Sequence, residues 1–178
     1  MDPQDNIQRP ESTEPRKRYR SNEGMSVEYR GGQTTKTYLP VQKNYSQETC
    51  VVVGALMVVL GLVGFVVQDL FGAHFTYAHN IIHIVAGGLA MWFGFDSVAN
   101  SRRYAYIAGA IFGVLGVLGF ILGTVGIPSV PSLAEDTYLW RLIPGTLEFG
   151  VSDHILHCIY GVAFLIGASL TFKNYKKV

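Results

Sequence analysis

From Val51 onward, apolar residues dominate the chain in long runs that alternate with short polar or proline-containing connections. The runs cover residues 49–69, 79–97, 104–126 and 153–172. A helix needs about 20 mostly apolar residues to cross a bilayer, and a surface that is apolar all round suits contact with lipid. The pattern therefore predicts an all-α integral membrane protein with a four-helix transmembrane domain over residues 49–172.

The first and third runs are similar to each other, as are the second and fourth. GALMVVLGLVGFV (54–66) aligns without gaps on GAIFGVLGVLGFI (109–121), and HNIIHIVAG (79–87) aligns on DHILHCIYG (153–161). The offset is 55 positions in the first pair and 74 in the second, so the additional 19 residues fall in the last connection. The alignment predicts two helical hairpins in the same orientation, which form a parallel repeat.

Ionisable residues interrupt the beginning of the second and fourth runs. His79 and His83 are four residues apart and share a helix face, and Asp153 and His157 occupy the matched positions. Both helices enter the membrane from the same side, so these four side chains are expected at similar depth, facing one another. Ionisable groups within a membrane span usually face the bundle interior and are candidates for function.

Three imidazoles and one carboxylate suit tetrahedral zinc, or another transition metal such as copper or iron. The predicted metal ligands are His79, His83, Asp153 and His157, with His154 as an additional candidate.

Other interpretations stay open. His83 and His157 are alternatively the two axial ligands of a b-type haem, with Gly87 and Gly161 leaving room for the macrocycle. In a second alternative the protein is purely structural or an interaction protein, binds no cofactor, and its histidines form only hydrogen bonds.

A third alternative is a metal-dependent membrane hydrolase, in which Asp153, Glu148 or His154 is the base that activates a metal-bound water. The sequence contains no recognisable substrate groove, so a non-enzymatic role is favoured. The leading hypothesis is a membrane protein that binds a metal or haem, acting as an accessory subunit of a membrane complex or as a homo-oligomer.

The first 48 residues are polar, with eight Lys or Arg and seven Asp or Glu. Such a composition offers little to bury, so we predict a disordered tail. The basic stretch Arg16–Arg20 is a candidate for contact with anionic lipids. The near balance of charge in the tail argues against nucleic-acid binding.

Charge also predicts orientation. Thirteen of the fourteen Lys and Arg residues precede the first run, join the second to the third, or follow the fourth. By the positive-inside bias, both termini are cytoplasmic, including residues 173–178, and the other two connections face outward. The expected location is the cell membrane, which is the inner membrane in a Gram-negative organism.

The longer outward connection, residues 127–152, contains Pro128, Pro131 and Pro144. Prolines break helices, and the stretch AEDTYLWRLI (134–143) between two of them predicts a short amphipathic helix at the outer surface. Such a helix would cover the histidines or contact a partner subunit. His74, in the first outward connection, is assigned no role.

Three short motifs resemble a known group. Asn80–His83 begins the second run, Arg102–Ala105 leads into the glycine-rich third, and His154–His157 begins the fourth. Together they are similar to small four-helix bacterial membrane proteins grouped as a domain of unknown function. The resemblance covers residues 49–172. It implies a membrane location and a duplicated hairpin, emphasises His83 and His157, and implies no activity.

Overall fold

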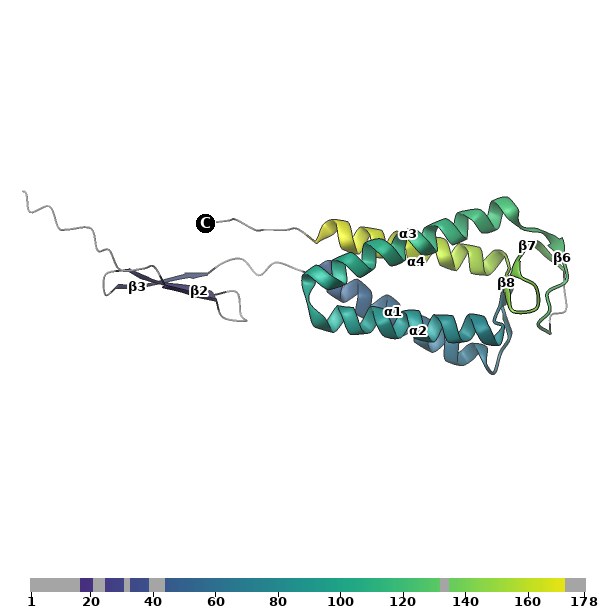
Figure 1. Cartoon of the computed structure of the whole chain (residues 1–178), viewed down its shortest axis with the longest axis horizontal. Coiled ribbons are helices and arrows are strands. Elements are labelled where there is room, and N and C mark those ends of the chain that lie inside the picture. The colour runs from purple at the N-terminus through teal and green to yellow at the C-terminus, as the bar shows by residue number, and fades with distance from the viewer. Residues whose placement is uncertain (1–16, 21–24, 31–32, 39–43, 132–134, 172–178) are drawn as a thin grey trace, which may run out of the picture. The chain divides into compact units, whose positions relative to one another are not determined.

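The computed structural model describes residues 17–20, 25–30, 33–38, 44–131 and 135–171. The chain divides after Lys43 into two units. The larger unit consists mainly of four helices (Figure 1): α1 (Tyr45–Gly64), α2 (Tyr77–Asp96), α3 (Val98–Leu122) and α4 (Val151–Leu170). All four are long and apolar enough to cross a membrane. The prediction of a mostly helical, bundled fold is confirmed, with helix ends shifted by a few residues.

The outward-facing side chains of the helices are those expected of a protein surrounded by lipid. Val52, Leu56 and Val59 of α1 are each more than half exposed, and the other helices likewise carry exposed aliphatic side chains. At a rise of about 1.5 Å per residue, a 20-residue helix spans about 30 Å, the thickness of the hydrocarbon layer. Within such a layer the helix satisfies its own backbone hydrogen bonds, so large apolar side chains need not be buried.

The buried faces of the helices follow a repeating pattern. Seven buried positions of α1 have buried counterparts 55 residues later in α3: Ser46, Cys50, Val53, Gly54, Met57, Gly61 and Gly64 correspond to Ser101, Ala105, Ala108, Gly109, Phe112, Gly116 and Gly119. Six buried positions of α2 have buried counterparts 74 residues later in α4: His79, Asn80, His83, Gly87, Ala90 and Gly94 correspond to Asp153, His154, His157, Gly161, Phe164 and Ala168.

Glycines allow the close packing of α1 on α2 and of α3 on α4. A Cβ added at Gly54 would lie 2.7 Å from the carbonyl oxygen of Gly87, and one added at Gly109 would lie 3.0 Å from that of Gly161. Helices in lipid associate through such small-residue contacts, because burial of apolar surface contributes little there. The two helix pairs therefore pack through matched positions.

Short strands join the helices at the end of the bundle where α2 and α4 begin (Figure 1). They are β4 (Asp69–Leu70), β5 (Ala73–His74), β6 (Thr124–Gly126), β7 (Asp136–Ile143) and β8 (Leu147–Phe149). We call these five strands the β cap. β4 pairs with β5, and β7 lies between β6 and β8, all antiparallel. The tight turn before β5 uses Gly72, whose φ of 78° suits glycine.

β7 corrects one prediction. Residues 136–143 form a strand and not the amphipathic helix expected in this connection. The stretch Thr137–Trp140 contains β-branched and aromatic residues, which favour strands. The strand also obtains hydrogen-bonded neighbours on both sides, β6 and β8, and a helix at this place would leave those two segments unpaired.

The smaller unit contains three antiparallel strands: β1 (Lys17–Arg20), β2 (Met25–Arg30) and β3 (Gln33–Tyr38). This part of the tail differs from the disorder predicted for residues 1–48. β2 and β3 pair in register from Met25 with Tyr38 to Arg30 with Gln33. Arg16 and residues 173–178 lie outside the described residues.

We expect Gly87→Ala to destabilise the bundle by about 1–3 kcal/mol, the usual effect of overpacking a well-packed interior. The added Cβ would lie 2.5 Å from the carbonyl oxygen of Gly54. Gly88→Ala is the matched control, because a Cβ there meets nothing within 4 Å. Thermal unfolding in detergent measures both. Equal unfolding temperatures for the two variants would contradict the packing described here.

Candidate metal centre

Three histidines from two helices converge below the β cap. His79 and His83 come from α2 and His157 from α4, and one ring nitrogen of each lies within 4.8 Å of the others. The Nε2 atoms of His79 and His83 are 3.0 Å apart. The ring centroid of His157 is 5.8 Å from that of His79 and 6.0 Å from that of His83. We call these three residues the histidine triad; all three are at most 3% exposed.

A backbone carbonyl orients the first of these rings. His79 Nδ1 lies 3.0 Å from the carbonyl oxygen of His74. A carbonyl oxygen only accepts, so Nδ1 carries the hydrogen, and Nε2 of neutral His79 presents a lone pair toward the other two rings. Metal-binding histidines commonly have such a carbonyl partner, which fixes the tautomer and the ring orientation.

The dimensions of the histidine triad suit a metal ion. Zn–N bonds of about 2.0–2.1 Å in tetrahedral geometry place two ligand nitrogens about 3.3 Å apart. The separation of the His79 and His83 Nε2 atoms is already close to this value, and the candidate ligand nitrogen of His157 lies within 4.8 Å of the other two. Neutral imidazole suits zinc, copper, iron and nickel, whereas magnesium and calcium prefer oxygen ligands.

Aromatic side chains surround the histidine triad. The Phe149 ring centroid lies 5.0 Å from that of His79 and 5.3 Å from that of His157. Phe75 packs against both histidines of α2, Phe112 against His157, and Tyr160 against His83. The nitrogens are therefore kept from water, in surroundings where electrostatic interactions are strong.

Asp153 lies close to the histidine triad but has other partners. Its Oδ2 accepts hydrogen bonds from the backbone N–H groups of His74 and Gly150, both at 2.8 Å. The first N–H groups of a helix need acceptors, and Gly150, at the start of α4, has no side chain to supply one. Asp153 thus caps α4 and joins it to β5.

His154 points away from the histidine triad. Its Nε2 donates to the carbonyl oxygen of Tyr138 at 2.8 Å, and its ring packs against Gly119 and Phe120 of α3. The structure therefore brings together three of the five predicted metal ligands. The orientation of His154 follows the repeat. His154 corresponds to Asn80, whose side chain is likewise directed at a glycine of the neighbouring helix.

Gly87 and Gly161 do not provide space for a haem. Gly87 is in backbone contact with Gly54, and Gly161 with Gly109 and Gly113. These glycines bring helices together, and the aromatic side chains around His83 and His157 occupy the remaining space. The residues present do not fit a macrocycle.

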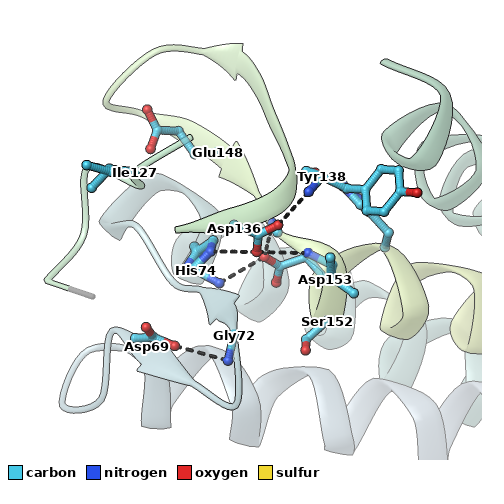
Figure 2. Close-up of polar contacts among 12 residues, drawn as sticks. Asp69, Gly72, His74, Ile127, Asp136, Tyr138, Glu148, Ser152 and Asp153 are labelled. Atoms are coloured by element: carbon cyan, nitrogen blue, oxygen red, sulfur yellow. Dashed lines mark hydrogen bonds and ion pairs between the residues drawn. The ribbon is translucent and has the colours of Figure 1, made fainter. Parts of the chain in front are cut away.

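A buried histidine–aspartate pair was missed by the sequence reasoning. His74 Nε2 lies 3.0 Å from Asp136 Oδ2, and that oxygen also accepts the N–H of Val151 at 3.1 Å. Figure 2 shows Asp136 between His74 and Tyr138, whose N–H donates to Asp136 Oδ1 at 2.8 Å. Because 62 residues separate His74 from Asp136, no local sequence motif predicts the pair.

Glu148 is a second buried carboxylate of the β cap. It accepts hydrogen bonds from the Ser129 N–H and hydroxyl and from the Gly145 N–H, at 2.7–2.8 Å, and lies 3.4 Å from Arg141 Nε. Burial raises the pKa of this carboxyl, but the hydrogen bonds and Arg141 outweigh burial and hold its pKa below the ordinary value. Glu148 therefore joins the two parts of the longer connection.

No protein-family model, curated protein or solved structure matches the chain. The similarity to four-helix bacterial membrane proteins therefore rests on the three short motifs, and the argument for function rests on the geometry of the site.

The lowered pKa of Glu148 predicts an acid-sensitive β cap. A carboxyl with a lowered folded pKa stabilises the fold above its ordinary pKa of 4.5 and loses that effect as pH falls through the folded value. We expect amide exchange at Ser129 and Gly145, corrected for intrinsic rates, to accelerate in that range. Glu148→Gln should accelerate it about tenfold at neutral pH, since a hydrogen bond to a charged group contributes about 1.5–3 kcal/mol. Retained acid sensitivity in this variant would assign the effect to another group.

Proposed function

We propose that this chain is a four-span membrane protein that binds one transition-metal ion, zinc being the first choice, through His79, His83 and His157. The observation that carries the proposal is the convergence of three buried imidazole rings, one of them oriented by a backbone carbonyl. Three imidazole ligands and no thiolate form a ligand set that is common for zinc and also accepts copper or iron.

The hydrogen bonds of the three histidines favour metal binding over the alternative in which the histidines only form hydrogen bonds. Within the histidine triad, His83 donates to His79, and that hydrogen bond is the observation in favour of the structural alternative. The His157 ring, however, has no hydrogen bond to any described residue, and its Nδ1, like that of His83, is fully buried without a partner. A buried polar atom without a partner costs about 1–3 kcal/mol. A metal ion gives His157 the partner that the other two histidines do not supply.

The hydrolase alternative has less support. Each group considered as its base has a different role: Glu148 and Asp153 accept backbone hydrogen bonds, and His154 donates to a carbonyl. The metal ligands are also almost inaccessible to water. Burial to this extent argues against a site that hydrolyses a substrate, even though three histidines would leave a fourth metal position open.

We further propose that the bundle arose by duplication of a helical hairpin, with both chain termini cytoplasmic and the β cap outside. The coincidence of thirteen buried positions between the two hairpins supports the duplication. The axis relating the hairpins passes between matched residues that meet each other: Ser46 and Ser101 at one end, with their hydroxyl oxygens 3.0 Å apart, and His83 and His157 at the other. The charge distribution supports the orientation.

Metal titration tests the site. Detergent-purified protein should bind one Zn²⁺ per chain, and His83→Ala or His157→Ala should weaken binding by more than about 100-fold, since loss even of an outer partner weakens metal binding by 10–100-fold. Chelator competition and metal analysis after dialysis measure the affinity and stoichiometry.

His154→Asn is the matched control, because it removes a buried histidine of the same helix and installs the residue found at the matched position, Asn80. It should bind Zn²⁺ normally. Wild-type protein without stoichiometric Zn²⁺, Cu²⁺ or Fe²⁺ binding would refute the proposal and leave the hydrogen-bonded cluster.

Cysteine labelling tests the orientation. In a background with Cys50 and Cys158 replaced by alanine, single cysteines at exposed Thr137 and Arg103 should react differently with a membrane-impermeant maleimide. We expect intact cells to label the cysteine at position 137 and permeabilised cells to label both. The reverse pattern would invert the proposed topology.

A further inference from the structure

Tyr160 places a hydroxyl group beside the histidine triad that has no role in holding the fold together. The side chain is 4% exposed, and its hydroxyl is buried without a hydrogen-bond partner among the described residues. Its ring centroid lies 6.3 Å from that of His83 and 6.0 Å from that of Phe112. An orphaned buried hydroxyl costs about 1–3 kcal/mol, so its position requires an explanation.

The helix directs this hydroxyl toward the metal ligands. Tyr160 follows His157 by three residues, so the two side chains share a face of α4. Long side chains on a helix lean back toward its N-terminus and cover the preceding turn. In α4 the preceding turn contains His157, and the ring contact with His83 places Tyr160 against the second helix of the site as well.

Two of the other polar groups nearby, Asp153 and His154, have the partners described above. The amide of Asn80 is directed at Gly64 of α1 and has no hydrogen-bond partner among the described residues. Three histidines leave the fourth position of a tetrahedral metal free. Phe75, Phe112 and Phe149 pack against the histidine triad, and phenylalanine donates no hydrogen bond.

We propose that the metal bound by the histidine triad holds a small exogenous ligand, a water molecule or a small anion, in its fourth position, and that the Tyr160 hydroxyl donates a hydrogen bond to it. This inference rests on the proposed metal binding. It assigns to the site the capacity to hold a small anion, beyond the metal ion itself, and explains why the partner of Tyr160 is no protein atom.

Azide binding to the Co²⁺-loaded protein tests the inference, because the visible absorption of Co²⁺ reports its ligands. We expect azide to change the spectrum of the wild-type protein in a saturable way. Tyr160→Phe should bind Co²⁺ with unchanged affinity but require at least about tenfold more azide, since a hydrogen bond to a charged acceptor contributes about 1.5–3 kcal/mol.

Tyr104→Phe is the matched control. The Tyr104 hydroxyl donates to the Ala86 carbonyl oxygen at 2.6 Å, away from the histidine triad, so this variant should bind azide normally. It should also lower the unfolding temperature of the metal-free protein, whereas Tyr160→Phe, which removes an unpaired hydroxyl, should not. Comparing the two variants distinguishes a weaker contact with azide from a less stable fold.

The outcomes are distinguishable. Absence of Co²⁺ and Zn²⁺ binding in the wild type would refute the proposed function itself. Stoichiometric Co²⁺ binding with no response to azide, or with equal azide affinity in Tyr160→Phe, would refute only the inference. Should Tyr160→Phe fail to fold, the azide stretching frequency of the wild-type adduct in H₂O and D₂O decides: a shift supports the hydrogen bond, and an unchanged frequency refutes it.

Discussion

The hydrogen bond between His79 Nδ1 and the His74 carbonyl oxygen is the interaction on which the site depends. It determines which nitrogen of His79 faces the other two rings, and it ties α2 to β5. The N–H of His74 in turn donates to Asp153, and its ring pairs with Asp136. One residue of the β cap therefore joins the beginnings of both helices that carry the histidine triad, and the imidazoles meet because these helix ends are held together.

Helix capping explains why two matched hairpins carry different residues at the site. α2 begins after Thr76, whose hydroxyl accepts the N–H of His79, so the His79 side chain is free to face the histidine triad. α4 begins after Gly150, which offers no side chain, and Asp153 at the matched position instead turns back to accept the N–H of Gly150. A symmetric packing framework thus acquires an asymmetric set of three imidazoles.

Sequence reasoning succeeds here where the physical signal is local or repeated. Helix length and all-round apolarity predict the four helices, and the alignment predicts that His83 and His157 meet. Sequence reasoning fails where a residue's partner is distant in the chain. Asp153 was predicted as a ligand because residue type alone does not distinguish a ligand from a helix cap. The His74–Asp136 pair and the pairing of β7 likewise depend on contacts that form only when both connections fold together.

The β cap also bears on which ions the proposed site would accept. Phe149 of β8 lies against His79 and His157, and the neighbouring Glu148 anchors that strand through Ser129 and Gly145. The buried Glu148 carboxylate therefore helps to hold an apolar side chain over the imidazole nitrogens. An ion bound by the proposed site would give up its water shell and receive imidazole in return. Magnesium releases water reluctantly and calcium requires six to eight oxygen ligands, so this exchange favours zinc, copper or iron over either.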